Sequence, residues 1–445
     1  MSVESNNLHR PLSAAQLGVW VAQDLDRASP VFNIGQYVQI HGAADTVLFE
    51  AALRRVTRES DALRLVFSET DDGPRQAVHP SLDWNLTTLD FGGQAAPEAA
   101  AQTWMTMDMA RPQELTGAPL FHFALLRVSP HCTFWYQRYH HIINDGVGVW
   151  LIARRVAQIY TDLIGGRDPE GRPFPPVAGL LSEERSYRAS QRFTQDRQYW
   201  LERLADREEP SSFSSLSRVA PAVARRRTAY LSQSDTDRLR AVARQTGSNL
   251  TQLVTAALAT YLHRMTGVSQ VTLGMAVTAR IGAVARCVPA MMSDVLPLPL
   301  TVRPDMLMGE LLGQVARETR RALRHQRLRS EDLRRGLGLL ESGGKLYGPT
   351  VNSMPFDYDL RFGDQRATTH NLSNGPVDDL SIAVYDQSDS SQLRIDFDAH
   401  PGLYEAQELA EHQLRLCRIL HNIAADRRIG QLDLLDATER RQIFL

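Results

Sequence analysis

Two adjacent histidines and an acidic turn are the residues of this sequence best suited to chemistry. His140 and His141 close the run CTFWYQRYHH, and Asp145-Gly146 follows after three more residues. Imidazole titrates near neutral pH, so it suits proton handling at an amine or a hydroxyl. Adjacent side chains of a strand point to opposite faces, which makes it hard for both rings to serve one metal ion or one proton. We expect one histidine to face inward as support and the other to face a cavity and act.

The turn after the histidines adds to this interpretation. Asp145 can fix the loop through an ion pair, and Gly146 permits an unusual backbone angle or the close approach of a substrate. Taken alone, such a histidine pair is more often structural. A metal site is disfavoured because the sequence has no His-x-x-x-His on a helix and no cysteine cluster. A serine nucleophile is disfavoured because Gly-x-Ser-x-Gly is absent.

Alternating strands and helices must position these residues. CTFWYQRYH (132–140) is rich in strand formers, and LRLVF (63–67) is a shorter run of that kind. A helix over 147–164 is closed by Gly165-Gly166. An earlier helix begins at a capping Asp45 and places Leu48, Phe49, Ala52, Leu53 and Val56 on one face.

The second half of the chain also alternates predicted helices and strands. A polar helix is expected over 182–204, and further helices over 248–267, 306–326 and 404–425, with a strand at 270–277. The helix over 248–267 should bury the following side chains: Leu250, Leu253, Val254, Ala257, Leu258, Tyr261, Leu262 and Met265. The pattern predicts two α+β lobes of similar size, with a boundary near 175–225.

Composition excludes several classes of protein. The 445 residues carry a net charge of −2, so a nucleic-acid surface is not expected. No apolar run approaches the roughly 20 residues that a bilayer requires, and the first ten residues lack the apolar core of a signal peptide. Cys132, Cys287 and Cys417 lie far apart and are expected to be buried thiols. These features predict a soluble, cytoplasmic protein.

The sequence resembles the condensation domains of nonribosomal peptide synthetases. Residues 140–146 match their His-His-x-x-x-Asp-Gly signature, of which the chloramphenicol acetyltransferase superfamily shares the second His and the Asp-Gly. Other segments resemble further motifs of the family, in the right order: LSAAQLGVW (12–20), ESDALRLVF (59–67), DVLPLPL (294–300), RHQR (324–327) and LYGPTVNSMPFDYDL (346–360). ESDALRLVF lacks the family's first Arg and its His, and Asp294 stands in the place of an Asn. LDLLDATERRQIFL (432–445) resembles the linker that leads to an adenylation domain.

The resemblance implies an α+β fold of two chloramphenicol acetyltransferase-like lobes, which form a V-shaped pseudo-dimer with a central tunnel. Residues 1–175 would form the N-terminal, donor-side lobe, 176–225 the inter-lobe helix and linker, and 226–445 the C-terminal lobe. Donor and acceptor carrier proteins would present thioesters on 4'-phosphopantetheine arms from opposite faces. The domain itself would hold no cofactor and no metal, and an adenylation domain would be its neighbour.

The resemblance also gives the residues their roles. His141 would be the catalytic residue in the tunnel, as general base or as positioner of the acceptor amine. His140 and Asp145 would be structural, Arg280 of VTAR would pair with Asp145, and Gly146 would offer its backbone to the oxyanion. Candidate tunnel residues are Met292, Ser293, Asp294, Tyr358 and Asp379.

The subtype follows from motifs that are present or absent. An epimerisation domain needs Glu-Gly-His-Gly and a heterocyclisation domain needs a double-Asp motif, and both are absent. WYQRYHH, RHQR, FDYDL and NGPVDDL (374–380) most resemble the enterobactin-synthetase type of condensation domain, whose donor is an aryl acid. This favours a starter-type domain in a siderophore assembly line. The alternative is an elongation domain with a peptidyl donor.

Two other classes of function stay open at this point. A stand-alone acyltransferase that uses coenzyme A would transfer acyl groups from free acyl-CoA as well as from carriers. The tail that resembles an adenylation linker argues against it. A non-catalytic recruitment module would bind a partner enzyme without forming product. The presence of both histidines argues against that class.

Overall fold

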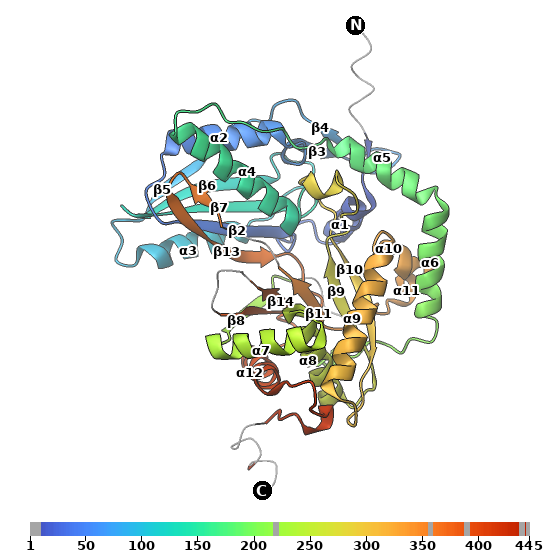
Figure 1. The fold of residues 1–445 in the computed structure, drawn as a ribbon. Coiled ribbons are helices and arrows are strands. Elements are labelled where there is room, and N and C mark those ends of the chain that lie inside the picture. Colours follow the sequence, from blue (N-terminus) through green and yellow to red (C-terminus); the bar gives the residue numbers. More distant parts are fainter. Residues whose placement is uncertain (1–9, 217–221, 355–358, 387–391, 436–440, 442–445) are drawn as a thin grey trace. The chain divides into compact units, whose positions relative to one another are not determined.

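The computed structural model describes residues 10–216, 222–354, 359–386, 392–435 and 441 (Figure 1). The chain divides into two compact units. The N-terminal unit comprises the described residues of 1–190, 280–293 and 358–376, and the C-terminal unit comprises those of 191–279, 294–357 and 377–445. Two segments of the expected C-terminal lobe, 280–293 and 358–376, thus belong to the N-terminal unit.

A six-stranded sheet forms the centre of the N-terminal unit. Its strands, in spatial order, are β12 (Arg361–Phe362), β13 (Gln365–Asn374), β2 (Asn33–Ile40), β7 (Cys132–His140), β6 (Phe121–Ser129) and β5 (Thr87–Asp90). Neighbours are antiparallel except β5 and β6. A smaller sheet contains β1 (Arg10–Pro11), β4 (Arg75–Val78) and β3 (Leu65–Ser68). The pairing of β13 with β2 brings a strand from late in the chain into the sheet formed by its early strands.

Helices cover both faces of the six-stranded sheet. The α-helices of this unit are α1 (Ala14–Asp24), α2 (Thr46–Glu59), α3 (Pro97–Met109), α4 (Gly146–Ile164) and α5 (Val177–Arg188), and short turns of 3₁₀-helix are η2 (Ala62–Arg64) and η3 (Ala285–Cys287). Figure 1 shows α2 and α4 on one face and α3 on the other. Alternate side chains of β7 therefore enter two cores, with Trp135 and Tyr139 on the side of α4 and Phe134 and Tyr136 on the side of α3.

The helix α2 shows why these residues fold as they do. Asp45 accepts a hydrogen bond from the N–H of Leu48 at 3.0 Å and caps the first turn. Phe49, Ala52, Leu53 and Val56, predicted to share one face, are buried in the core with β2 and β7. The predicted strand over 132–140 is confirmed as β7.

A second six-stranded sheet forms the centre of the C-terminal unit. Its strands, in spatial order, are β10 (Asp294–Thr301), β9 (Gln270–Val277), β11 (Thr350–Ser353), β14 (Leu380–Tyr385), β15 (Arg394–Ala399) and β8 (Arg225–Tyr230). The helices are α6 (Gln191–Arg203), α7 (Gln233–Thr246), α8 (Leu250–Thr266), α9 (Met308–Arg324), α10 (Ser330–Gly336), α11 (Leu339–Ser342), α12 (Ala406–Asn422) and η4 (Ile429–Gln431). The apolar faces of α7, α8, α9 and α12 pack with this sheet in one core.

Three sequence predictions differ from the structure. The helix expected over 182–204 is two helices, α5 and α6, because the chain leaves helical geometry at Ala189 and Ser190. Met265, expected to face inward, is 46% exposed because it lies in the last turn of α8, beyond the packed core. Cys287, expected to be buried, is exposed on η3, whereas Cys132 and Cys417 are partly buried.

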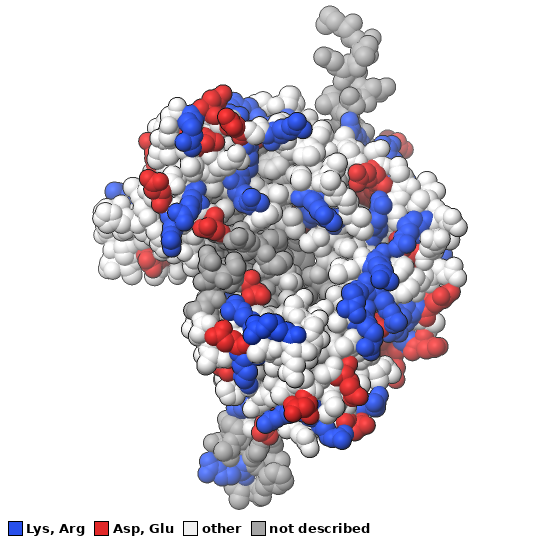
Figure 2. All heavy atoms as spheres, in the orientation of Figure 1, with Lys and Arg blue, Asp and Glu red and all other residues white. Residues whose placement is uncertain are grey.

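Charged side chains of both signs are spread over the face drawn in Figure 2, and basic ones gather over α6 and α9. The α9 arginines that lie on the surface follow helical spacing: Arg317, Arg320, Arg321 and Arg324. Arg321 and Arg203 of α6 both pair with Glu318, at 2.8 and 3.3 Å. Part of the positive charge is therefore neutralised within the C-terminal unit.

Candidate active site

His140 is the last residue of β7, and its ring is buried beside α1. Its Nε2 lies 3.1 Å from Oε1 of Gln23, and its Nδ1 accepts a hydrogen bond from the N–H of Ile142 at 3.2 Å. Burial lowers the pKa of His140 to about 3, with smaller contributions from His141 and Arg138. His140 is therefore neutral near pH 7 and supports the end of the strand.

His141 follows β7 directly and keeps strand pairing, since its N–H donates to the carbonyl of Phe32 at 2.8 Å. Its Nδ1 lies 2.8 Å from the carbonyl oxygen of Asn144. A carbonyl can only accept, so Nδ1 carries the proton and the neutral ring has its lone pair on Nε2. The loop thus selects the tautomer in which Nε2 can accept a proton.

Gly375 packs against the ring of His141. It follows β13 and has a φ of +95°, a conformation that side chains with a Cβ rarely adopt. A Cβ at this position would lie 2.8 Å from Cδ2 and 3.4 Å from Nε2 of His141. The sequence reading missed this residue. Its only signal in the sequence is the NGPVDDL segment that contains it.

Asp145 caps α4 and holds the histidine loop to a distant segment. Its Oδ1 accepts the N–H of Gly148 at 3.0 Å, and its Oδ2 lies 2.6 Å from Nη1 of Arg280. Oδ2 also accepts the N–H groups of Met292 and Ser293, at 3.0 and 2.9 Å. Burial alone would raise the pKa of Asp145, but the charge and hydrogen bonds of Arg280 outweigh it, and the pKa is lowered.

Arg280 extends this anchor within the N-terminal unit. Its Nη2 donates to the carbonyl of Ala290 at 2.9 Å, so one guanidinium joins the histidine loop to the segment 280–293. Both side chains of the Asp145–Arg280 pair are only 1% exposed. Gly146 is the first residue of α4, so its N–H has no acceptor one turn earlier in the helix and suits an oxyanion.

The five candidate tunnel residues fall in different places. Met292 and Ser293 lie in the N-terminal unit, where their N–H groups bind Asp145. Asp294 and Asp379 lie in the C-terminal unit. Tyr358 lies outside the described residues. The tunnel itself stays a prediction.

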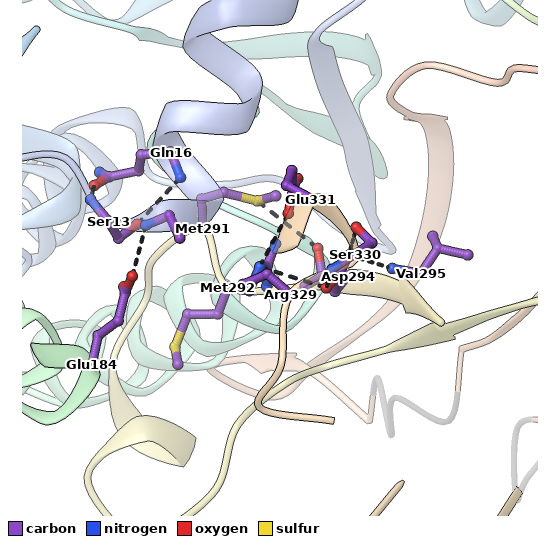
Figure 3. Close-up of polar contacts among 12 residues, drawn as sticks. Ser13, Gln16, Glu184, Met291, Met292, Asp294, Val295, Arg329, Ser330 and Glu331 are labelled. Carbon is purple, nitrogen blue, oxygen red and sulfur yellow. Dashed lines mark hydrogen bonds and ion pairs between the residues drawn. The ribbon is translucent and has the colours of Figure 1, made fainter. Parts of the chain in front are cut away.

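The two candidate tunnel aspartates of the C-terminal unit, Asp294 and Asp379, both make contacts that stabilise the fold. Asp294 accepts the Oγ and N–H of Ser330 at 2.6 and 2.9 Å, and Arg329 lies 3.5 Å away (Figure 3). These bonds fasten the start of α10 to β10. Asp379 accepts hydrogen bonds from Tyr404 and from Ser212, and burial raises its pKa.

The LSAAQLGVW segment begins α1. Ser13 and Gln16 form a reciprocal capping box, in which each side chain accepts the backbone N–H of the other, and Glu184 accepts the N–H of Ala14 at 3.0 Å (Figure 3). This segment therefore fixes α1, the helix that supplies Gln23 to His140.

Among residues 10–216, 222–354, 359–386, 392–435 and 441, no group of three or more His, Cys, Asp or Glu could hold a metal ion. Within the same ranges, no helix combines the length and apolar character that a bilayer crossing requires.

The two-unit α+β fold and the histidine loop are those expected of the acetyltransferase-like class of acyltransferases. A family model described as "Condensation domain" matches residues 6–444, so the chain belongs to the condensation domain family. Condensation domains of nonribosomal peptide synthetases are acyltransferases that form amide bonds. The expected two-lobed fold and the expected family are both confirmed.

Two curated relatives and a solved structure support the same family assignment. The chain is 43% identical over 443 residues to a dimodular nonribosomal peptide synthase of Bacillus subtilis (strain 168), covering 99% of this chain and 19% of that protein. It is 29% identical to enterobactin synthase component F of Escherichia coli (strain K12), and the match covers 98% of this chain and 34% of that protein. Among solved structures, the starter condensation domain of rhizomide synthetase in complex with C8-CoA is 45% identical to this chain, with a TM-score of 0.91. The match covers 96% of this chain and 98% of that structure. The chain thus spans about a fifth to a third of these two curated relatives.

Proposed function

We propose that this chain catalyses the first condensation of a nonribosomal assembly line. The amine of a carrier-bound aminoacyl thioester attacks the carbonyl carbon of a donor acyl thioester. A C–N bond forms, the C–S bond of the donor breaks, and the amine proton leaves with the donor thiol. The observation that carries this proposal is the 45% identity to a starter condensation domain over 96% of the chain.

The histidine loop supplies the groups for this step. Nε2 of His141 accepts the proton of the attacking amine or positions that amine, because Nδ1 is committed to Asn144. The N–H of Gly146 at the start of α4 faces the developing oxyanion. Asp145 and Arg280 keep the loop in this geometry and take no part in proton transfer.

The partners are proposed from the relatives. Both curated synthases are several times longer than this chain. Donor and acceptor carrier proteins would therefore deliver the substrates on 4'-phosphopantetheine arms, and an adenylation domain would follow the chain. The domain needs no resident cofactor for this chemistry.

The donor is proposed to be an aryl acid without an α-amine, in a siderophore-type assembly line. Support comes from the WYQRYHH and NGPVDDL segments and from the relationship to an enterobactin synthase. An aliphatic acyl-CoA is the second candidate, because the rhizomide synthetase starter domain was solved with C8-CoA. A free aminoacyl donor is disfavoured, since burying its α-ammonium without a partner is costly. An elongation domain with a peptidyl donor is the remaining alternative.

A competition between donors tests this proposal. One acceptor carrier loaded with an amino acid is mixed with equal amounts of aryl, octanoyl, L-aminoacyl, D-aminoacyl and peptidyl donors, each as carrier thioester and as CoA thioester. We expect the aryl carrier thioester to give the main amide product. A preference for octanoyl-CoA would select the second candidate. A preference for peptidyl donors of one configuration would contradict the starter assignment.

A further inference from the structure

Two glutamines face each other in the sheet that leads to His141. Gln36 of β2 and Gln137 of β7 are direct partners in the antiparallel register. Side chains alternate along a strand, so Gln137 shares its face with Tyr139 and His141, two and four residues later. Gln36 shares the same face with Ile34, whose partner is Tyr139. This pair of amides therefore lies on the face of the sheet toward which His141 points.

Both amides are buried in an apolar core. Gln36 is 3% exposed and Gln137 is fully buried, while Ile34, Val38, Trp135 and Tyr139 around them belong to the core shared with α2 and α4. In the part of the chain that the structure describes, the Nε2 groups of Gln36 and Gln137 have no hydrogen-bond acceptor. Two unpaired amide donors side by side in a core are rare, because each one costs folding free energy.

The remaining polar atoms of the two side chains do not supply the missing acceptors. Oε1 of Gln137 accepts the hydroxyl of Tyr139 at 3.0 Å, so its amide is already oriented, with the N–H groups left to donate. Within the described residues, the side chain of Gln36 makes no hydrogen bond. The pair thus offers N–H groups and lacks an oxygen to receive them.

The amide pair is close to the reacting end of the site. Gly375 lies against both His141 and Ile34, since a Cβ there would be 2.8 Å from Cδ2 of His141 and 3.4 Å from Cγ2 of Ile34. Gln36 is two residues beyond Ile34 on the same face, a step of about 7 Å along a strand. An acyl group whose thioester carbon is at His141 and whose body follows β2 would reach the amides within a few bonds.

We infer that Gln36 and Gln137 recognise the donor acyl group, and that the preferred donor carries a hydrogen-bond-accepting oxygen, such as a ring hydroxyl, a few bonds beyond its thioester carbon. This rests on the proposed function. Both nitrogens are closed to solvent, so an accepting oxygen of the bound donor exchanges their unpaired state for a paired one. A donor that is pure hydrocarbon leaves them unpaired, and a site of this kind discriminates strongly against such an analogue.

Matched donors test the inference on the whole chain. Rates of amide formation are measured with 2,3-dihydroxybenzoyl and benzoyl thioesters, and with 3-hydroxyoctanoyl and octanoyl thioesters. We expect kcat/KM to favour the oxygen-bearing member of at least one pair by about tenfold or more. Gln36→Met and Gln137→Met should move that ratio toward one by lowering kcat/KM for the oxygen-bearing donor.

A third glutamine of β2 provides the control. Gln39 lies three residues beyond Gln36 on the opposite face, where its Oε1 is 3.1 Å from Nε2 of His370. Gln39→Met should leave the donor ratio as in the parent chain. Gln36→Met removes no hydrogen bond within the described structure, so its melting temperature should equal or exceed that of the parent chain.

The outcomes separate the two proposals. If amide forms but the donor ratio is near one, or is unchanged in both glutamine variants, the inference is wrong while the proposed function stands. If the parent chain forms no amide with any donor, the proposed function fails and the inference falls with it. A melting temperature well below that of the parent chain for Gln36→Met would contradict the unpaired state of this amide.

Discussion

The carboxylate of Asp145 lies 2.6 Å from the guanidinium of Arg280, 135 residues later in the chain, and both side chains are almost completely buried. The same carboxylate receives three backbone N–H groups, from Gly148, Met292 and Ser293. The loop that orients His141 is thus anchored from a segment that the chain contributes after passing through residues 191–279 of the C-terminal unit. This pair is a positioning device and leaves proton transfer to His141.

Breaking the Asp145–Arg280 pair should destabilise the protein. Asp145→Ala or Arg280→Ala leaves one buried charge without its partner, which costs about 3–5 kcal/mol. A double-mutant cycle by chemical denaturation measures the coupling. The double variant should lose much less than the sum of the single losses. Strictly additive losses would show that the two charges do not interact.

His140 should make the protein less stable as the pH falls below about 6.5. Its pKa is about 3 when folded and 6.5 as a free side chain, so below pH 6.5 the unfolded chain binds a proton that the folded chain excludes. The stability that neutral His140 contributes is complete above pH 6.5 and is lost as the pH falls toward 3. Denaturation at a series of pH values should show a shallower acid slope for His140→Gln. His41→Gln, at an exposed histidine, is the control. An identical slope for His140→Gln and the parent chain would contradict the buried neutral state.

Gly375 should be needed for catalysis as well as for folding. Gly375→Ala places a methyl group 2.8 Å from Cδ2 of His141, so the ring must shift and kcat should fall by about tenfold or more. Gly73→Ala is the matched control, since Gly73 has the same φ of +95° and open space around it. Both variants should lose similar stability from backbone strain, but only Gly375→Ala should lower kcat. An equal kcat for the two variants would remove Gly375 from the site.

Local sequence patterns predicted the elements that carry the histidine loop. β7 follows from a run of strand formers, and α4 follows from a stretch that is closed by Gly165-Gly166, and both signals act within a few residues. Arg280 was assigned from the family resemblance, because spacing alone does not show which arginine reaches a given loop. The break between α5 and α6 was missed, since the sequence there has neither Gly nor Pro.

The order of the strands in each sheet could not be predicted from the sequence. β13 pairs with β2 across more than 300 residues, and this pairing alone brings Gly375 to His141. The alignment of Gln36 with Gln137 likewise depends on the register of β2 and β7. A shift of β2 by one residue would turn Gln36 to the other face and separate it from Gln137. Strand order and register depend on the packing of whole sheets, so no single segment of the sequence predicts them.

The most direct test of the account is the intact mass of an acceptor carrier after reaction. The carrier, loaded with an amino acid on its phosphopantetheine arm, is incubated with a loaded donor and either the parent chain or His141→Ala. We expect the parent chain to add the mass of one acyl group, and His141→Ala to reduce the rate on the order of 10²-fold or more. The histidine assignment would be contradicted by an equal rate of mass gain with His141→Ala, and amide formation by the absence of any gain with every donor.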